Sequence, residues 1–338
     1  READEASLHA ATIEVQAPYV AEMVRAYMVE QFGEDAYSAG YRVYTTLDGK
    51  RQNAASSALR DGLLAYDRRH GYRGVARHFE LQPDVSVDTL EDLLKGTKTV
   101  GGLLAAIVVE VEGQSARIYL AGEGYAELDW EGISWARSYV SGNQQGPELK
   151  SADQVMQRGD LIRVEVLPEG RWRLAQVPIV SGALVSIHPQ DGALQALAGG
   201  FDFYHSKFNR ATQAQRQPGS SFKPFVYSAA LDKGYTVASL FNDAPVVFDD
   251  PSLETAWRPE NYSGKFYGPT RMREALIHSR NLVSIRLLRA VGAGYATRYV
   301  QRFGFRPAQI PGNLSLALGS GTATPLEMAR AYSVFANG

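Results

Sequence analysis

Hydrophobic positions recur at three- and four-residue steps near the start of the chain. The positions in this stripe are Val20, Met23, Val24, Tyr27 and Met28. Such spacing is the signature of a helix that buries one face. We therefore predict helix across residues 1–40, with a stop at Gly33.

The pattern changes period in the next thirty or so residues. Valine, tyrosine and paired threonines in Tyr41–Leu47 predict a strand. A stripe formed by Ala55, Leu59 and Leu63 then predicts a helix from about Arg51 to Arg69. We interpret residues 1–70 as linker helices and a strand that lead into a later domain.

Short β-type runs dominate the middle of the chain. They are separated by Gly-rich turns and comprise Leu103–Val111, Ala116–Leu120, Tyr125–Trp130, Leu161–Val166 and Trp172–Val177. The tripeptide Pro168-Glu169-Gly170 joins the last two runs. Several short strands at close spacing predict a small all-β barrel or sandwich, which we place at residues 71–176.

A hairpin followed by helices characterises the last part of the chain. Two apolar runs, Ala183–Ile187 and Ala193–Ala198, flank the turn residues of Pro189–Gly192. From Ser220 onward a helical face is predicted, formed by Phe222, Phe225, Val226, Ala229 and Ala230. Residues 177–338 thus form a third domain, and the whole chain is predicted to be multi-domain α+β.

Composition narrows the possible functions. The 338 residues carry a net charge of −2, which provides no basic field for nucleic acid. Cysteine is absent, so neither a disulfide frame nor a thiolate metal site is possible. The six histidines are scattered without a metal-ligand spacing, and we expect no metal and no organic cofactor. No apolar run reaches the ~18 residues that span a bilayer.

One tetrapeptide has the chemistry of an activated nucleophile. Ser220 and Lys223 lie three residues apart at the start of the predicted helix, which places their side chains on one face. A serine hydroxyl needs a base to take its proton. Lysine serves as that base when desolvation or a nearby cation lowers its pKa. Serine is also a favoured helix N-cap, so the tetrapeptide taken alone favours a structural role.

A second polar element interrupts two apolar helical stretches. Ser279-Arg280-Asn281 lies between Arg271–Ile277 and Leu282–Val291. Residues two apart do not share a helix face, so Ser279 and Asn281 reach one site only from a turn. There Ser279 could relay a proton and Asn281 could hold a substrate amide. The alternative is a polar turn with local capping bonds, our interpretation of a similar triplet, Ser141-Gly142-Asn143.

A third element, Gly319-Ser320-Gly321-Thr322, precedes a helix predicted over Leu326–Ala336. Gly-rich loops that enter helices bind anions in some proteins. This loop lacks the lysine of a P-loop and the preceding strand of a dinucleotide site. We therefore interpret it as a tight turn before a helix that starts at Thr324 or Pro325.

The order of these segments resembles the class A penicillin-binding proteins. The resemblance covers nearly the whole chain, and the β-rich insert is similar to the OB-like module of the 1a type in Gram-negative bacteria. The segments that carry it are Gln217–Phe225, Arg258–Gly264, Tyr267–Pro269, Ser279–Asn281, Ala317–Gly319 and Thr324–Glu327. The implied fold is an incomplete transpeptidase domain of the type shared with serine β-lactamases, carrying an OB-like β-barrel.

The resemblance implies a peptidoglycan D,D-transpeptidase. Ser220 would attack the D-Ala-D-Ala end of a stem peptide, with Lys223 as base, Ser279 in proton transfer and Asn281 on the substrate. β-Lactams would acylate Ser220. Alternatives are a hydrolase that uses the same serine and lysine, and a non-catalytic β-lactam-binding scaffold.

Further expectations concern the longer protein. The family also has a Lys-Thr-Gly segment, which is absent from this chain and is expected after Gly338. The resemblance implies an upstream glycosyltransferase domain, a membrane anchor outside this fragment and a location at the periplasmic face of the inner membrane. It also implies a possible regulatory protein at the OB-like module.

Overall fold

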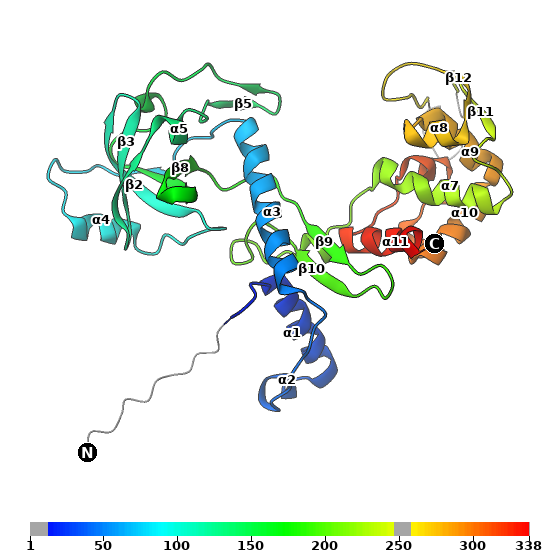
Figure 1. Cartoon of the computed structure of the whole chain (residues 1–338), viewed down its shortest axis with the longest axis horizontal. Coiled ribbons are helices and arrows are strands. Elements are labelled where there is room, and N and C mark those ends of the chain that lie inside the picture. Colours follow the sequence, from blue (N-terminus) through cyan, green and yellow to red (C-terminus); the bar gives the residue numbers. More distant parts are fainter. Residues whose placement is uncertain (1–12, 247–257, 338) are drawn as a thin grey trace. The chain divides into compact units, whose positions relative to one another are not determined.

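The computed structural model describes residues 13–246 and 258–337. The chain divides into two compact units (Figure 1). Unit 1 comprises Arg1–Leu184 with Ala196–Asn209, and unit 2 comprises Val185–Gln195 with Arg210–Gly338.

Unit 1 begins with three helices, α1 (Pro18–Phe32), α2 (Asp35–Ser38) and α3 (Gly49–Arg69). The predicted stop is confirmed, because Gly33 ends α1 with a positive φ of 56° and its N–H bonds to the carbonyl of Val29. The predicted helix over Arg51–Arg69 is confirmed by α3. Its N-terminus is capped by Asp48, whose side chain accepts from the N–H of Arg51.

Two predictions for this region are wrong. Helix does not extend over residues 13–17, and residues 1–12 lie outside the described residues. The segment Tyr41–Leu47 belongs to no strand. Its residues are largely exposed, Tyr44 by 88%. Strand propensity reflects side-chain packing on a half-buried sheet, and this segment has no such surface to pack on.

An antiparallel sheet forms the middle of unit 1, in the order β1-β7-β2-β3-β4 with β8 beside β7. The five predicted β runs are confirmed. The strands are β1 (Arg77–His78), β2 (Leu104–Glu112), β3 (Ser115–Leu120), β4 (Gly124–Leu128), β7 (Asp160–Val166) and β8 (Trp172–Ala175). Between them lie α4 (Val87–Leu94), α5 (Trp130–Ile133), β5 (Tyr139–Ser141), β6 (Gln144–Gln145), η1 (Ala152–Gln154) and η2 (Pro168–Gly170).

Both faces of this sheet carry apolar clusters, one of them beneath α4. β4 and β8 approach each other without hydrogen bonds, so in the described residues the predicted barrel is not closed. Ser141 is the last residue of β5, and Gly142 and Asn143 form the turn to β6, which agrees with the interpretation of this triplet as a polar turn.

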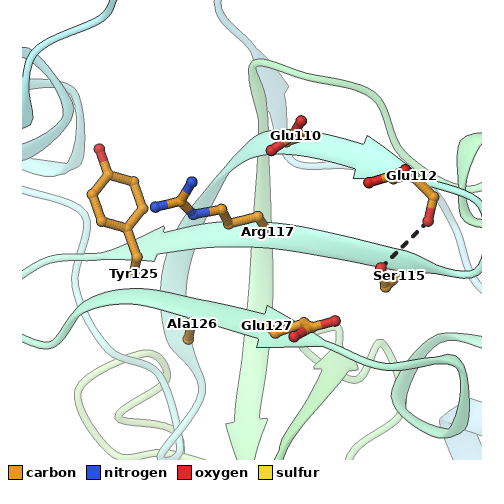
Figure 2. Close-up of a pocket in the computed structure, with 7 residues that line it drawn as sticks. All are labelled: Glu110, Glu112, Ser115, Arg117, Tyr125, Ala126 and Glu127. Atoms are coloured by element: carbon orange, nitrogen blue, oxygen red, sulfur yellow. Dashed lines mark hydrogen bonds between the residues drawn. The ribbon is translucent and has the colours of Figure 1, made fainter.

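A hollow of about 390 Å³ is lined by residues of β2, β3 and β4 (Figure 2). Arg117 is directly opposite Glu110 on one neighbouring strand and Glu127 on the other. Its guanidinium nevertheless lies over the ring of Tyr125, 4.4 Å from the centroid. The arginine is thus held at one end of the hollow by a cation–π contact.

A two-stranded sheet, β9 (Leu184–Ile187) with β10 (Leu194–Ala198), confirms the predicted hairpin. The N–H of His188 donates to the carbonyl of Ala193 at its turn. The elements that lie wholly in unit 2 are α6 (Arg210–Gln213), η3 (Gly219–Phe222), α7 (Lys223–Asp232), β11 (Leu240–Asp243), β12 (Gly268–Arg271), α8 (Met272–Ile277), α9 (Asn281–Val291), α10 (Ala293–Val300), η4 (Gln301–Phe303), η5 (Pro307–Gln309), η6 (Leu314–Leu318) and α11 (Pro325–Asn337).

Helix α7 is the centre of unit 2 and packs on α9 and α10 (Figure 1). The apolar face predicted from Ser220 onward is fully buried. Phe225 is 0% exposed, and its ring contacts those of Phe303 and Phe305. This core fixes the position of the helix start, where Ser220 and Lys223 lie.

Replacing Phe225 with Ala is expected to lower the free energy of unfolding of unit 2 by about 3–5 kcal/mol, because it opens a cavity at a fully buried aromatic site. Leu231→Ala is the matched control, since Leu231 is on the same helix but 46% exposed; its expected cost is below about 1 kcal/mol. Hydrogen exchange measured by mass spectrometry should show lost protection in α7 and α9 and none in β2 and β3. Equal effects of the two substitutions would contradict this account of the core.

Candidate active site

Ser220 and Lys223 lie one helical turn apart at the entry to α7. Ser220 is within the 3₁₀ turn η3, and Lys223 is the first residue of α7. Side chains at i and i+3 of a 3₁₀ turn eclipse each other, so the two residues point in similar directions. The Ser220 side chain is exposed, whereas Lys223 is only 1% exposed. The hydroxyl therefore faces solvent and the amine lies in the protein.

The Gly-rich loop at 319–322 braces the segment that precedes Ser220. The N–H of Gly219 donates to the carbonyl of Gly319 (3.2 Å), and Arg216 forms a two-way backbone bridge with Ala323. Gly319 has a φ of 69°, and a Cβ there would collide with the backbone of Gly219. Glycine is thus required at 319 for both conformation and space. The prediction of a tight turn before a helix is confirmed, since α11 begins at Pro325.

Ser279 and Asn281 both reach Lys223 because the chain turns sharply between α8 and α9. Ser279 has a φ of 52°, the single positive φ at a non-glycine residue in the described chain. This conformation is sparsely populated for residues with a Cβ and costs about 1–3 kcal/mol. The predicted turn between two helices is therefore present, and strained at the serine.

The amine of Lys223 contacts three oxygen atoms. Nζ donates to the carbonyl oxygen of Ser279 (2.7 Å), to Ser279 Oγ (3.0 Å) and to Asn281 Oδ1 (2.8 Å). An ammonium has three N–H donors, and these acceptors engage all of them. Lys223 must lose one proton before its lone pair can accept a hydrogen bond from a serine hydroxyl.

Burial lowers the pKa of Lys223 from 10.5 to about 8. The physical cause is desolvation, which disfavours the charged amine. Part of the population is therefore neutral close to neutral pH. A buried lysine tuned in this way meets the requirement for a general base.

Asn281 retains hydrogen-bonding capacity beyond Lys223. Its Nδ2 donates one bond to the carbonyl of Glu260 (2.9 Å). A carboxamide has two N–H donors and two lone pairs. One donor and one lone pair thus remain after the bonds to Glu260 and Lys223, enough to bind an amide group.

A buried residue that no sequence pattern revealed, Asn261, lies beneath this site. Asn261 Oδ1 accepts from the backbone N–H groups of Asn281 (2.9 Å) and Leu282 (3.4 Å). Asn261 lies in the segment Arg258–Gly264, which the family resemblance had marked without assigning a role to any side chain. Asn261 and Asn281 are 20 positions apart, and a contact at that separation leaves no periodic pattern in the sequence.

Comparisons with known proteins match the two parts of the chain separately. A model of the penicillin-binding protein OB-like domain matches residues 72–180. A model of the penicillin binding protein transpeptidase domain matches residues 182–338. The chain belongs to the penicillin-binding protein family.

Similar proteins align with both matched parts of the chain. Penicillin-binding protein 1A of Pseudomonas aeruginosa is 49% identical over 98% of this chain, and that of Escherichia coli is 48% identical over 100%. The chain spans about 40% of the length of these relatives. The crystal structure of penicillin-binding protein 1A from Haemophilus influenzae superposes with a TM-score of 0.85 at 38% identity, covering 99% of this chain and 48% of that one.

The described residues show neither a metal-ligand cluster nor a membrane-spanning helix. No group of three or more histidine and acidic side chains there is arranged to hold a metal ion. Within the same residues, every helix is too short or too polar to traverse a bilayer.

The lowered pKa of Lys223 predicts a pH-dependent stability. Between about pH 8 and 10.5 the unfolded chain binds a proton at Lys223 that the folded chain has lost, so folding becomes more favourable as pH rises through this window. The free energy of unfolding of the wild type, minus that of Lys223→Met, should therefore increase from pH 7 to pH 10. Urea unfolding at several pH values measures this difference, and a flat difference would contradict the lowered pKa.

Proposed function

We propose that this chain provides the nucleophile and base of a serine D,D-transpeptidase that cross-links peptidoglycan stem peptides. The observation that carries the proposal is the buried amine of Lys223. It lies one turn after the exposed Ser220 and bonds to Ser279 and Asn281. Lys223, Ser279 and Asn281 thus share one hydrogen-bonded cluster. Ser220 lies in the turn that leads into α7, the helix that begins with Lys223.

The first step forms an acyl-enzyme. Neutral Lys223 takes the proton of Ser220, whose Oγ attacks the carbonyl carbon of the penultimate D-Ala. The bond to the terminal D-Ala nitrogen then breaks, and Ser279 passes the proton from Lys223 to that leaving amine. The backbone N–H of Ser220 contributes to the oxyanion hole, because the first amides of a helix are free to bind developing negative charge.

The second step transfers the acyl group. The amine of a neighbouring stem peptide attacks the ester carbonyl and loses a proton to Lys223. Ser220 Oγ leaves and regains a proton, which restores the resting site. Asn281 would hold the substrate amide with its remaining donor and lone pair. A β-lactam follows the first step only, since its ring opens without releasing a leaving amine, and it blocks Ser220 as a stable ester.

Properties of the longer protein extend this proposal. We propose that it also carries a glycosyltransferase domain and acts at the periplasmic face of the inner membrane, as expected from its penicillin-binding protein 1A relatives. A regulatory protein at the OB-like sheet and a membrane anchor outside this chain stay predictions. Detection of the native protein in isolated inner membranes, with protease accessibility from the periplasm, tests the location.

Incubation with a labelled penicillin should modify this chain at Ser220. Peptide mass mapping locates the label, and Ser220→Ala should abolish it while thermal unfolding stays unchanged. Ser221→Ala is the matched control, because Ser221 is the adjacent exposed serine and should remain dispensable. A label on any residue other than Ser220 would contradict the assignment of Ser220 as the nucleophile.

Lys223→Ala is expected to slow acylation about 10²–10⁴-fold, the usual contribution of a general base. For the wild type, the rate should rise with pH through about 8, since only the neutral amine of Lys223 accepts a proton. Stopped-flow measurement with a chromogenic β-lactam gives both quantities. Normal acylation of Lys223→Ala would refute its role as base.

A further inference from the structure

Helix α9 begins without a side-chain cap of its own. Arg280 occupies the N-cap position and makes no capping bond, as expected because a guanidinium is not an acceptor. The first backbone N–H groups of a helix need an acceptor from elsewhere. Asn261 provides one, since its Oδ1 accepts from Asn281 N–H (2.9 Å) and, more weakly, from Leu282 N–H (3.4 Å). The cap of α9 thus comes from 20 residues upstream.

Asp243 determines which way the Asn261 carboxamide points. Asn261 Nδ2 donates to Asp243 Oδ1 (2.7 Å) and to the carbonyl of Lys265 (2.9 Å). An ionised carboxylate and a carbonyl only accept hydrogen bonds, so they select the amide nitrogen. The oxygen of Asn261 must then face α9. Asp243 is 0% exposed and Asn261 is 5% exposed, so water cannot readily substitute for either partner.

These bonds continue without a break to the amine of Lys223. Asp243 holds Asn261, Asn261 holds the backbone of Asn281, and Asn281 Oδ1 accepts from Lys223 Nζ at 2.8 Å. Among the residues that the structure describes, the second oxygen of Asp243 has no hydrogen-bond partner. A buried oxygen without a hydrogen bond lowers the stability of the fold. This cost indicates that Asp243 does more than stabilise the fold.

A second attachment holds the same two segments together. Arg286, on the next turns of α9, donates to the carbonyls of Ala244 and Pro245. These residues directly follow Asp243. The body of α9 therefore stays attached to this segment when Asn261 is changed. Substitution of Asn261 should therefore displace the start of α9, together with Ser279 and Asn281, while the rest of the helix stays folded.

We propose that Asn261 and Asp243 are positioning residues of the transpeptidase site, which hold the Ser279–Asn281 turn against the base Lys223. Neither residue touches the reacting atoms. This inference rests on the proposed function, in which Lys223 must be aligned with Ser220. Misplacement of such a group by about 1 Å can cost 10²-fold in rate.

Asn261→Ala should slow acylation of the 338-residue chain by labelled penicillin about 10- to 100-fold. It should also move the midpoint of the pH–rate profile to lower pH, because the Lys223 ammonium loses the firm bond to Asn281 that favours its charged form. Asp48→Ala is the matched control. It removes the cap of α3, where Asp48 Oδ1 accepts from Arg51 N–H (2.9 Å), and should lower the melting temperature without changing the rate or the midpoint.

An exchange of the two side chains tests the direction of the hydrogen bond. Asn261→Asp alone places two carboxylates against each other and should slow acylation at least as much as Asn261→Ala. Asp243→Asn alone keeps an acceptor for Asn261 and should have the smallest effect of the three. In the double variant the amide introduced at 243 donates to the carboxylate introduced at 261. Acylation should then recover about 10-fold over Asn261→Asp.

Each result bears on the proposal. A wild-type rate and midpoint in Asn261→Ala, or no recovery in the double variant, would overturn it. A slower rate with an unchanged midpoint would also overturn it, since that is the result of lost stability alone. If neither this chain nor the longer protein that contains it is labelled, the proposed function fails, and the inference is decided by NMR. In protein labelled with ¹³Cε-lysine, the Lys223 signal is assigned by its loss in Lys223→Arg. The titration midpoint of that signal must differ between the wild type and Asn261→Ala. An unchanged midpoint would overturn the inference.

Discussion

The candidate active site in unit 2 depends on keeping one primary amine out of water. An uncompensated buried charge is expensive, and Lys223 avoids the full cost in two ways. Its amine bonds to three oxygens, and burial lowers its pKa to about 8. The same burial that disfavours the ammonium makes a neutral amine available as a base. Stability and reactivity at this position therefore have one physical origin.

The surroundings of Lys223 come from segments far apart in the chain. The loop at 319–323 braces the backbone before Ser220, and the strained turn at Ser279 presents two acceptors. Asn261 supports that turn from a third segment. The loop and Asn261 act through hydrogen bonds to the backbone, which constrain its position. The exposed hydroxyl of Ser220 is consequently left accessible to a substrate.

Local sequence patterns predicted most of the elements whose buried side chains recur with the period of a helix or a strand. The apolar face of α7 and the five β runs are examples, because each buries apolar side chains against a core that neighbouring elements complete. Tyr41–Leu47 shows the limit of this reasoning. Its residues have high strand propensity, yet strand formation requires a partner and a surface, and the segment remains exposed without either. The apparent barrel likewise proved to be a sheet whose ends approach without pairing.

The sequence by itself determined which residues have the chemistry for acyl transfer. Ser220 and Lys223 are three apart, so helical geometry alone aligns them, and an ordered series of segments identified the family. Only the tertiary structure decided that Ser279 and Asn281 meet Lys223, that its amine is buried, and that Asn261 and Asp243 support the turn. These contacts join residues separated by 18 to 58 positions. Their formation depends on how helices and strands pack, which no local period in the sequence records.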